Sequence, residues 1–290
     1  MNPTKITDTL KHILSSAKQI ATSISHNTNV SNSLLVESIY RQRLSEHKNE
    51  FARKYAKKHF SQTDEDGITL EITKRIRSRK AGYGKHFIEF GVGDGCENNT
   101  LVLLSLGWKG SWFGGQDLAF DAKDSQSLRF HKSWITKNNI IPLYNQALTD
   151  WSIAEVDMIS LDLDGNDYYF IESLLSQDCR PPLFICEYNA IFPVDASWQI
   201  KYDDKHQWQG DHYFGASLGS FINLFSSHDY FLCACNPHTG ANAFFIRNEF
   251  RDLFPEIPEK IEDIYAPPFY MLGNHFMHRI SPEFIRSVFT

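Results

Sequence analysis

The sequence predicts an α/β fold built on a Rossmann-like sheet of seven strands, mostly parallel and closed by an antiparallel hairpin, with a helical extension at its N-terminus. Two observations predict it. From residue 85 to about residue 247, short apolar runs alternate with helical segments, which is the pattern of βαβ units. The last two runs are separated only by residues 235–242, too few for a crossover helix, so we expect those strands to pair antiparallel.

The first 60 residues have a different texture. Apolar residues recur at helical spacing over 6–24, a Ser/Asn-rich loop is expected over 26–33, and a second helix over 34–60. We therefore predict a helical extension over 1–60, a Rossmann-like domain over 61–250 and a wrapping tail over 251–290. The helices either pack onto the main domain, mediate dimerisation or shape the substrate entrance.

The elements of the sheet domain follow from apolar runs and their neighbours. The expected strands cover residues 86–90, 111–113, 140–144, 156–161, 183–187, 230–234 and 243–246. The expected helices cover residues 99–106, 167–175 and 216–226.

Composition narrows the class of protein. With 42% hydrophobic residues the chain can bury a full core, and its net charge of −6 argues against nucleic acid as the main partner. Five cysteines without paired spacing indicate reduced thiols. No apolar run reaches the ~20 residues of a membrane span, and the N-terminus has no apolar leader. We expect a cytoplasmic protein without a membrane span.

A glycine-rich loop follows the strand expected at 86–90. Glycines there let the backbone turn sharply beside a ligand, and free N–H groups at a helix start attract anionic groups. The spacing GxGxG, with an acid two residues upstream, differs from the dinucleotide form GxGxxG. It favours S-adenosylmethionine, whose carboxylate needs N–H donors and whose ammonium needs an acid. The expected cofactor-binding residues here are Glu89, Gly91, Gly93, Gly95 and Asn99.

A series of motifs between residues 61 and 247 resembles the FkbM-like methyltransferases, which are found in bacterial sugar, capsule and antibiotic pathways. The resemblance implies S-adenosylmethionine as methyl donor and an acceptor oxygen on a saccharide or related polar metabolite. The motifs are Gln62-x-x-Glu65-Asp66-Gly67-Ile68, Phe87-Ile-Glu-Phe-Gly91, Asn99-Thr100-Leu101, Gly107-Trp-Lys-Gly110 and Asp162-x-Asp164-Gly-Asn-Asp167.

The chain departs from this resemblance at one position. In class I methyltransferases an acid at the end of the second strand holds the ribose hydroxyls, and Gly114 stands there in this chain. Asp117, or Gln116, is expected to take that role from a slightly longer loop.

Acidic residues follow two strands that we expect to be neighbours. Asp162 and Asp164 follow the strand at 156–161, Glu187 ends the strand at 183–187, and Asn189 comes two residues later. The carboxyl ends of parallel strands form the ligand crevice of α/β sheets. Carboxylates this close repel one another unless they are protonated or bridged by a cation, and oxygen ligands suit Mg²⁺ or Mn²⁺. Asp167 is expected to cap a turn and helix instead.

The layout resembles metal-dependent catechol-type O-methyltransferases. That resemblance implies Asp162, Glu187 and Asn189 as metal ligands, with Asp164 as an alternative to Asp162 because both point to the same side of an extended chain. The cation would lower the pKa of an acceptor hydroxyl.

One histidine is a candidate for acid–base chemistry. His212, in a loop before the helix at 216–226, is either the general base, a metal ligand or an ordinary hydrogen-bonding residue. The sequence thus favours an O-methyltransferase with His212, Asp162 and Asp164 in catalysis. The alternatives are a nicotinamide- or other nucleotide-dependent Rossmann enzyme and a non-catalytic scaffold. A homo-oligomer formed through the N-terminal helices is a further expectation.

Overall fold

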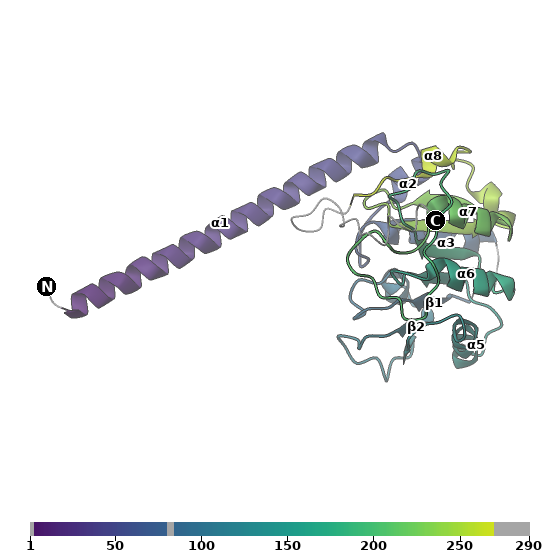
Figure 1. Cartoon of the computed structure of the whole chain (residues 1–290), viewed down its shortest axis with the longest axis horizontal. Helices are drawn as coiled ribbons and strands as arrows, with labels where there is room; N and C mark the ends of the chain where they lie inside the picture. The colour runs from purple at the N-terminus through teal and green to yellow at the C-terminus, as the bar shows by residue number, and fades with distance from the viewer. Residues whose placement is uncertain (1–2, 80–83, 270–290) are drawn as a thin grey trace. The chain divides into compact units, whose positions relative to one another are not determined.

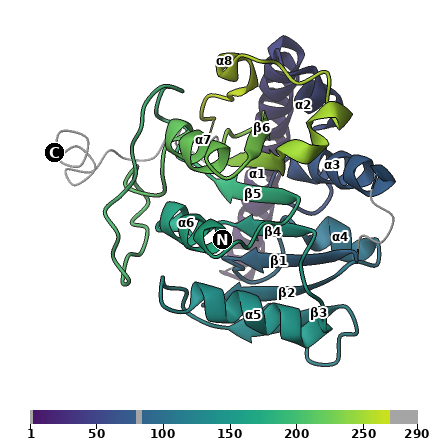
Figure 2. The ribbon, with the colours of Figure 1, turned by 90° about the vertical axis from the view of Figure 1, so that its right-hand side faces the viewer.

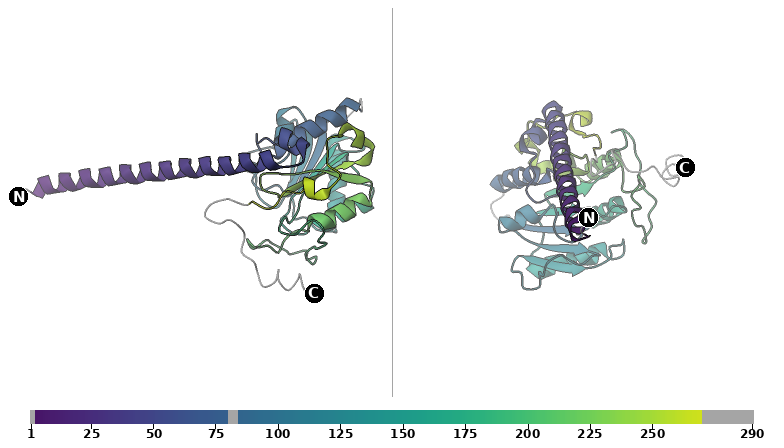
Figure 3. Two further views of the ribbon diagram at one scale, coloured as in Figure 1. Left: turned by 90° about the horizontal axis from the view of Figure 1, so that it is seen from above. Right: turned by 90° about the vertical axis from the view of Figure 1, so that its left-hand side faces the viewer.

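The computed structural model describes residues 3–79 and 84–269 (Figure 1), which form two compact units divided after Glu46. The first unit is α1 (Pro3–Glu46), one unbroken helix (Figure 3). The loop expected over 26–33 is therefore wrong. That stretch holds no Gly or Pro, and Ser33 bonds back to the carbonyl of Asn29 at 2.9 Å, so its polar side chains are satisfied within the helix.

The second unit begins with two helices before the sheet. The helix expected over 34–60 stops at Glu46 and resumes as α2 (Glu50–Tyr55), because the Asn49 side chain caps a new helix by accepting from the N–H groups of Phe51 and Ala52. α3 (Glu65–Arg79) was not expected from periodicity.

A seven-stranded sheet in the order β3-β2-β1-β4-β5-β7-β6 forms the centre of the second unit (Figure 2). Neighbouring strands are parallel except that β7 runs antiparallel to both β5 and β6, which confirms the expected Rossmann-like sheet with its closing hairpin. The strands are β1 (His86–Phe90), β2 (Lys109–Gly114), β3 (Leu128–Lys132), β4 (Met158–Leu161), β5 (Leu183–Glu187), β6 (Tyr230–Cys235) and β7 (Asn242–Arg247).

One expected strand is a helix, and one observed strand was not expected. The run at 140–144 begins α5 (Ile140–Trp151), whose buried residues Ile140, Tyr144 and Ala147 recur at helical spacing. Pro142 is accommodated there because it lies in the first turn, where its missing N–H removes no helical bond. β3 is a half-buried edge strand rich in basic residues, so it has no apolar run to reveal it.

The remaining helices connect the strands as expected. They are α4 (Leu101–Ser105), α6 (Asp167–Ser176) and α7 (Leu218–Ser226), followed by the 3₁₀ helix η1 (Asn248–Leu253) and α8 (Ile261–Ile264). Figure 2 shows α5, α6 and α7 on one face of the sheet. Tyr144, Phe170 and Phe221 from these helices belong to one apolar cluster with the strands. The tail expected over 251–290 lies in part outside the described residues.

The topology places the site. The chain leaves β1, β4 and β5 at the same edge of the sheet, at Phe90, Leu161 and Glu187. β7 enters at that edge, so Asn242 lies opposite Glu187 in the antiparallel register. Among the described helices, including the 44-residue α1, none combines the length and the apolar character needed to cross a membrane.

Candidate functional site

A cavity of about 280 Å³ opens at the carboxyl ends of β1, β4 and β5. Its wall is dominated by acids and amides. The carboxylates in it are Glu65, Glu89, Asp94, Glu97, Asp162, Asp164 and Glu187; the other lining residues are Gln62, Gly91, Gly93, Asn98, Asn99, Gln116 and Asn242. A ligand held here must carry positive charge, or bring a cation with it, on the side that faces these acids.

The glycine loop forms one side of the cavity. The N–H groups of Gly91 and Val92 both donate to the carbonyl of Phe113, at 2.9 and 3.2 Å, which ties the loop to the end of β2. Gly91 has φ +96°, and a Cβ there would lie 1.5 Å from the carbonyl oxygen of Asp162. A Cβ at Gly93 would meet no atom within 4 Å, so this glycine leaves open space in the cavity wall.

Close packing against the glycine loop explains why residue 114 is a glycine. A Cβ at this position would lie 2.0 Å from the carbonyl oxygen of Val92, so only glycine lets the loop approach the end of β2. Gly95 (φ +85°) also fulfils a steric need, because a Cβ there would lie 2.9 Å from Leu118 and Phe120. Gly95 is not among the residues that line the cavity.

Glu89 faces the cavity but also holds the start of α4. Its carboxylate accepts from the N–H groups of Asn99 (2.9 Å) and Thr100 (3.2 Å) and from the Thr100 hydroxyl. Burial raises the pKa of Glu89, and the hydrogen bonds from Thr100 and Asn99 oppose that rise. The side chain of Asn99 donates to the hydroxyl of Ser160 at 3.2 Å, which links the loop to β4.

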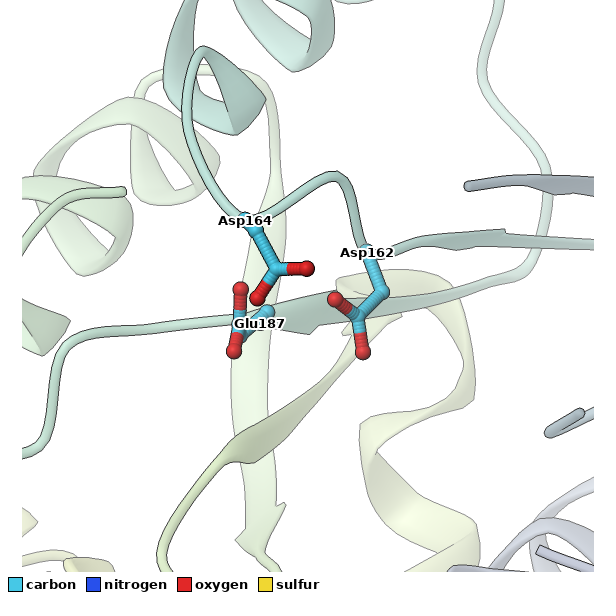
Figure 4. Close-up of side chains that lie close together, drawn as sticks. All are labelled: Asp162, Asp164 and Glu187. Carbon is cyan, nitrogen blue, oxygen red and sulfur yellow. The ribbon is translucent and has the colours of Figure 1, made fainter. Parts of the chain in front are cut away.

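Asp162, Asp164 and Glu187 come together as the sequence predicts. One carboxylate oxygen from each lies within 4.8 Å of the others, and Figure 4 shows the three side chains converging from the loop after β4 and the end of β5. Asp164 sits in the left-handed region at φ +52°. Asp167 holds this loop, because its carboxylate accepts from the N–H groups of Leu163 and Gly165, both at 2.8 Å.

The electrostatics of this acidic triad suit a cation. Burial raises the pKa values of Asp162 and Glu187 well above those of an ordinary Asp and Glu, and repulsion from the neighbouring carboxylates adds to that rise. Burial also raises the pKa of Asp164, while His206 lowers it. Glu187 Oε2 is buried and has no hydrogen-bond donor in the described part of the chain. Oxygen-only ligands of this charge fit a hard divalent ion such as Mg²⁺ or Mn²⁺.

The structure does not bring Asn189 or His212 to the triad. The Asn189 side chain donates to the carbonyls of His212 (2.9 Å) and Phe214 (3.1 Å) and accepts from the N–H of Ile191 (3.3 Å). Both Asn189 and His212 are 1% exposed, and neither lines the cavity. The hydrogen bonds of the Asn189 side chain therefore hold the backbone of residues 212–214.

The two residues expected beside the ribose lie in different places. The Asp117 side chain is 85% exposed and pairs with Lys132 at 2.7 Å, away from the cavity wall. Gln116, the alternative named from the sequence, does line the cavity.

Three lining residues, Gln62, Glu65 and Asn242, were given no role by sequence reasoning. Gln62 and Glu65 belong to a motif of the family resemblance, but nothing local places that motif beside the sheet edge. Glu65 is 2% exposed and accepts from the backbone and hydroxyl of Thr63 (3.1 and 3.0 Å), from Asn236 (2.6 Å) and from Asn242 (3.2 Å). It therefore joins the segment before α3 to the β6–β7 hairpin.

No protein-family model matches the sequence, and no curated protein sequence does either. Among solved structures, the chain is similar to MycE methyltransferase from the mycinamycin biosynthetic pathway in complex with Mg and SAH, with 16% identity and a TM-score of 0.40 over 74% of this chain and 57% of that one. It is also similar to the pyocyanin biosynthetic protein PhzM, with 10% identity and a TM-score of 0.36 over 62% of this chain and 56% of that one. The chain thus spans little more than half of either protein. Likeness at this level does not assign a function.

Proposed function

We propose that the protein is an S-adenosylmethionine-dependent O-methyltransferase, assisted by a divalent metal and acting on a saccharide or related polar metabolite. The observation that carries the proposal is the placement of the glycine loop and the acidic triad on one cavity. That cavity lies at the edge of a sheet in which antiparallel β7 is inserted between β5 and β6, the strand arrangement of class I methyltransferases.

The chain's own groups suit such a transfer. The donor's ammonium and sulfonium are cationic, and the wall beside the glycine loop offers Glu89, Asp94 and Glu97. Methyl transfer needs alignment of donor and acceptor and a deprotonated acceptor oxygen, with little further chemistry from the protein. Asp162, Asp164 and Glu187 would hold the cation. A bound divalent cation would lower the pKa of an acceptor hydroxyl and orient it.

Two alternatives have less support. A nicotinamide-dependent enzyme would carry the GxGxxG spacing, which this loop lacks. Gly114, at the position where class I methyltransferases carry an acid, would favour a non-catalytic scaffold, but the approach of Val92 to this residue gives the glycine a steric reason that does not require loss of cofactor binding.

Calorimetric titration tests the cofactor directly. S-adenosylmethionine is expected to bind, NAD and NADP are not, and Mg²⁺ or Mn²⁺ is expected to support formation of S-adenosylhomocysteine with members of a panel of sugars and polyols. Binding of a nicotinamide nucleotide in place of S-adenosylmethionine would overturn the proposal. Tight cofactor binding without turnover on any acceptor would favour the scaffold.

We also propose the bounds of the catalytic domain and the cellular location of the protein. Every cavity residue lies between Gln62 and Asn242, which supports 61–250 as the catalytic domain. All five cysteines are free thiols, four of them buried, which supports a reducing, cytoplasmic location.

We also propose that α1 pairs with α1 of a second copy of the chain. Leu14, Ile24 and Leu35 are each more than half exposed. Leu14, Ala17, Ala21 and Ile24 recur at spacings of three, four and three residues, and the same register continues through Thr28 and Ser31 to Leu35 on a face without charge, as in a coiled coil. Sedimentation of the full chain is expected to show a dimer. Ile24→Asp should give a monomer and Gln19→Asp, at a neighbouring polar position, should not; a monomeric wild-type chain contradicts the pairing.

A further inference from the structure

Asn242 and Glu187 face each other across two strands at the edge of the cavity. They are direct partners in the antiparallel register of β5 and β7, and both line the cavity. Side chains of directly opposed residues in an antiparallel pair project from the same face, with Cβ atoms about 4.5–5.5 Å apart. The Asn242 amide is therefore a neighbour of the acidic triad, although 54 residues lie between it and Glu187 in the sequence.

The orientation of the Asn242 amide is fixed by Glu65. Asn242 Nδ2 donates to Glu65 Oε1 at 3.2 Å, and an ionised carboxylate only accepts, so the NH₂ end must face Glu65. Glu65 is itself held by Thr63 and by Asn236, whose Nδ2 lies 2.6 Å from the same oxygen. The carbonyl end of the Asn242 amide is thereby directed away from Glu65.

Asn242 Oδ1 is a buried acceptor without a donor. The residue is 6% exposed, and in the described part of the chain no hydrogen-bond donor reaches this oxygen. Glu187 Oε2 on the facing strand is in the same condition. Buried polar atoms are almost always satisfied, so two unpartnered oxygens on directly opposed residues indicate a partner that is not a protein group. A divalent cation binds several oxygens at once, and the three carboxylates beside these residues favour its charge.

We propose that Asn242 Oδ1 is the fourth oxygen ligand of the divalent cation held by Asp162, Asp164 and Glu187. This inference rests on the metal-assisted function proposed above. An amide carbonyl is a hard oxygen ligand that adds a donor without adding charge to three carboxylates that already repel one another. Asn242 takes the place that the sequence assigned to Asn189, and Glu65 is its positioning residue.

Titration of the full chain with Mn²⁺, without S-adenosylmethionine, tests the inference independently of turnover. Free Mn²⁺ is followed by electron paramagnetic resonance. The Asn242→Ala variant is expected to bind Mn²⁺ at least about tenfold more weakly than the wild-type chain, a loss typical of groups that build a metal site. The matched control is Asn189→Ala, which removes an equally buried amide outside the cavity and is expected to leave Mn²⁺ affinity unchanged. Thermal melting in EDTA confirms that each variant is folded.

A second variant separates a ligand from a merely structural residue. Asn242→Asp, like Asn242→Ala, ends donation to Glu65, but it keeps an oxygen beside Glu187. A ligand role predicts that Mn²⁺ binding is retained by Asn242→Asp and lost by Asn242→Ala. A purely structural role predicts equal binding by the two variants, which overturns the inference.

The outcomes also separate this inference from the proposed function. Wild-type binding of Mn²⁺ together with equal affinity in folded Asn242→Ala overturns the role of Asn242 and leaves the metal site standing. Failure of the wild-type chain to bind Mn²⁺ or Mg²⁺ overturns both the metal assistance and this inference.

Discussion

Two groups of acids differ in what their oxygens contact: two acids that hold backbone loops, and the acidic triad that lines the cavity. Asp66 and Asp167 are fully buried and bind backbone donors: Asp66 Oδ2 accepts the N–H groups of His59, Phe60 and Ser61 at 2.6–2.9 Å, and the two oxygens of Asp167 accept those of Leu163 and Gly165 at 2.8 Å. Asp162, Asp164 and Glu187 converge on one another instead. The first group fixes loops, and the second lines the space in which a ligand would bind.

The largest effect is expected where an acid of the triad is removed. Glu187→Ala should reduce turnover by about a thousandfold, because the proposed metal site would lose one ligand and a bound metal stabilises a transition state by several kcal/mol. S-adenosylmethionine should still bind, since the glycine loop is untouched. Formation of S-adenosylhomocysteine and calorimetric titration of the cofactor measure the two effects, and EDTA should reproduce the loss in the wild-type protein. Full activity in chelator would remove the metal from the proposal.

The same experiment on an acid that holds a backbone loop should change stability instead. Asp66→Ala leaves three backbone N–H groups, in the segment that precedes α3, without their acceptor. The free energy of unfolding should therefore fall by about 3 kcal/mol. That corresponds to a decrease in melting temperature of roughly 6–12 °C for a domain of this size. Asp66→Asn, which keeps one acceptor oxygen, should lose less. If the folded Asp66→Ala variant bound Mn²⁺ weakly, the division between the two groups would fail.

The pH dependence of stability is a third way to test the comparison. Burial raises the pKa of Asp167 to about 7, and burial and repulsion raise the pKa of Asp162 and Glu187 well above its ordinary value. The folded chain therefore retains protons that the unfolded chain releases near pH 4. Without metal, this contribution to stability is greatest at low pH and is lost as the pH rises through about 7.

In the proposed metal site a divalent cation would replace those protons, so its effect on stability should grow with pH. At a hundred times its dissociation constant it should stabilise the folded state by about 2.7 kcal/mol, or roughly 5–10 °C in melting temperature, near pH 8, and by less near pH 5. Melting curves with EDTA and with Mn²⁺ measure the difference, and Glu187→Ala serves as the control without a complete site. An equal shift at both pH values would show that the cation does not compete with protons at the triad.

The sequence reveals the fold where local pattern and tertiary context agree. β1 and β5 are found at their true bounds because each is an apolar run that becomes buried. β3 has no apolar run, since an edge strand buries only part of its surface. The run at 140–144 fits a strand or a buried helix equally well from its composition, and only packing against the sheet makes it α5.

The residues of the site also divide into those that the sequence predicts and those that it does not. The convergence of Asp162, Asp164 and Glu187 follows from a general rule about parallel strand ends. Asn189, expected as a metal ligand, does not line the cavity. β5 ends at Glu187, so the alternation of side chains along a strand does not extend to Asn189, whose N–H donates to the carbonyl of Ala216. Asn242 reaches the cavity only through the register of β5 with β7, and no local pattern encodes a pairing between segments so far apart.

The smallest effect is expected at the acid that the sequence placed beside the ribose. Asp117 is exposed and pairs with Lys132 on the surface, where such pairs contribute little, so Asp117→Ala should change S-adenosylmethionine affinity by less than about twofold. Gln116 lines the cavity, and loss of one neutral hydrogen bond through Gln116→Ala should weaken binding by roughly two- to tenfold. Calorimetric titration of both variants decides between them. A tenfold loss in Asp117→Ala would place an acid at the ribose after all. It would add a third kind of carboxylate, exposed in the free protein and recruited by the cofactor, to the loop-holding acids and the acidic triad.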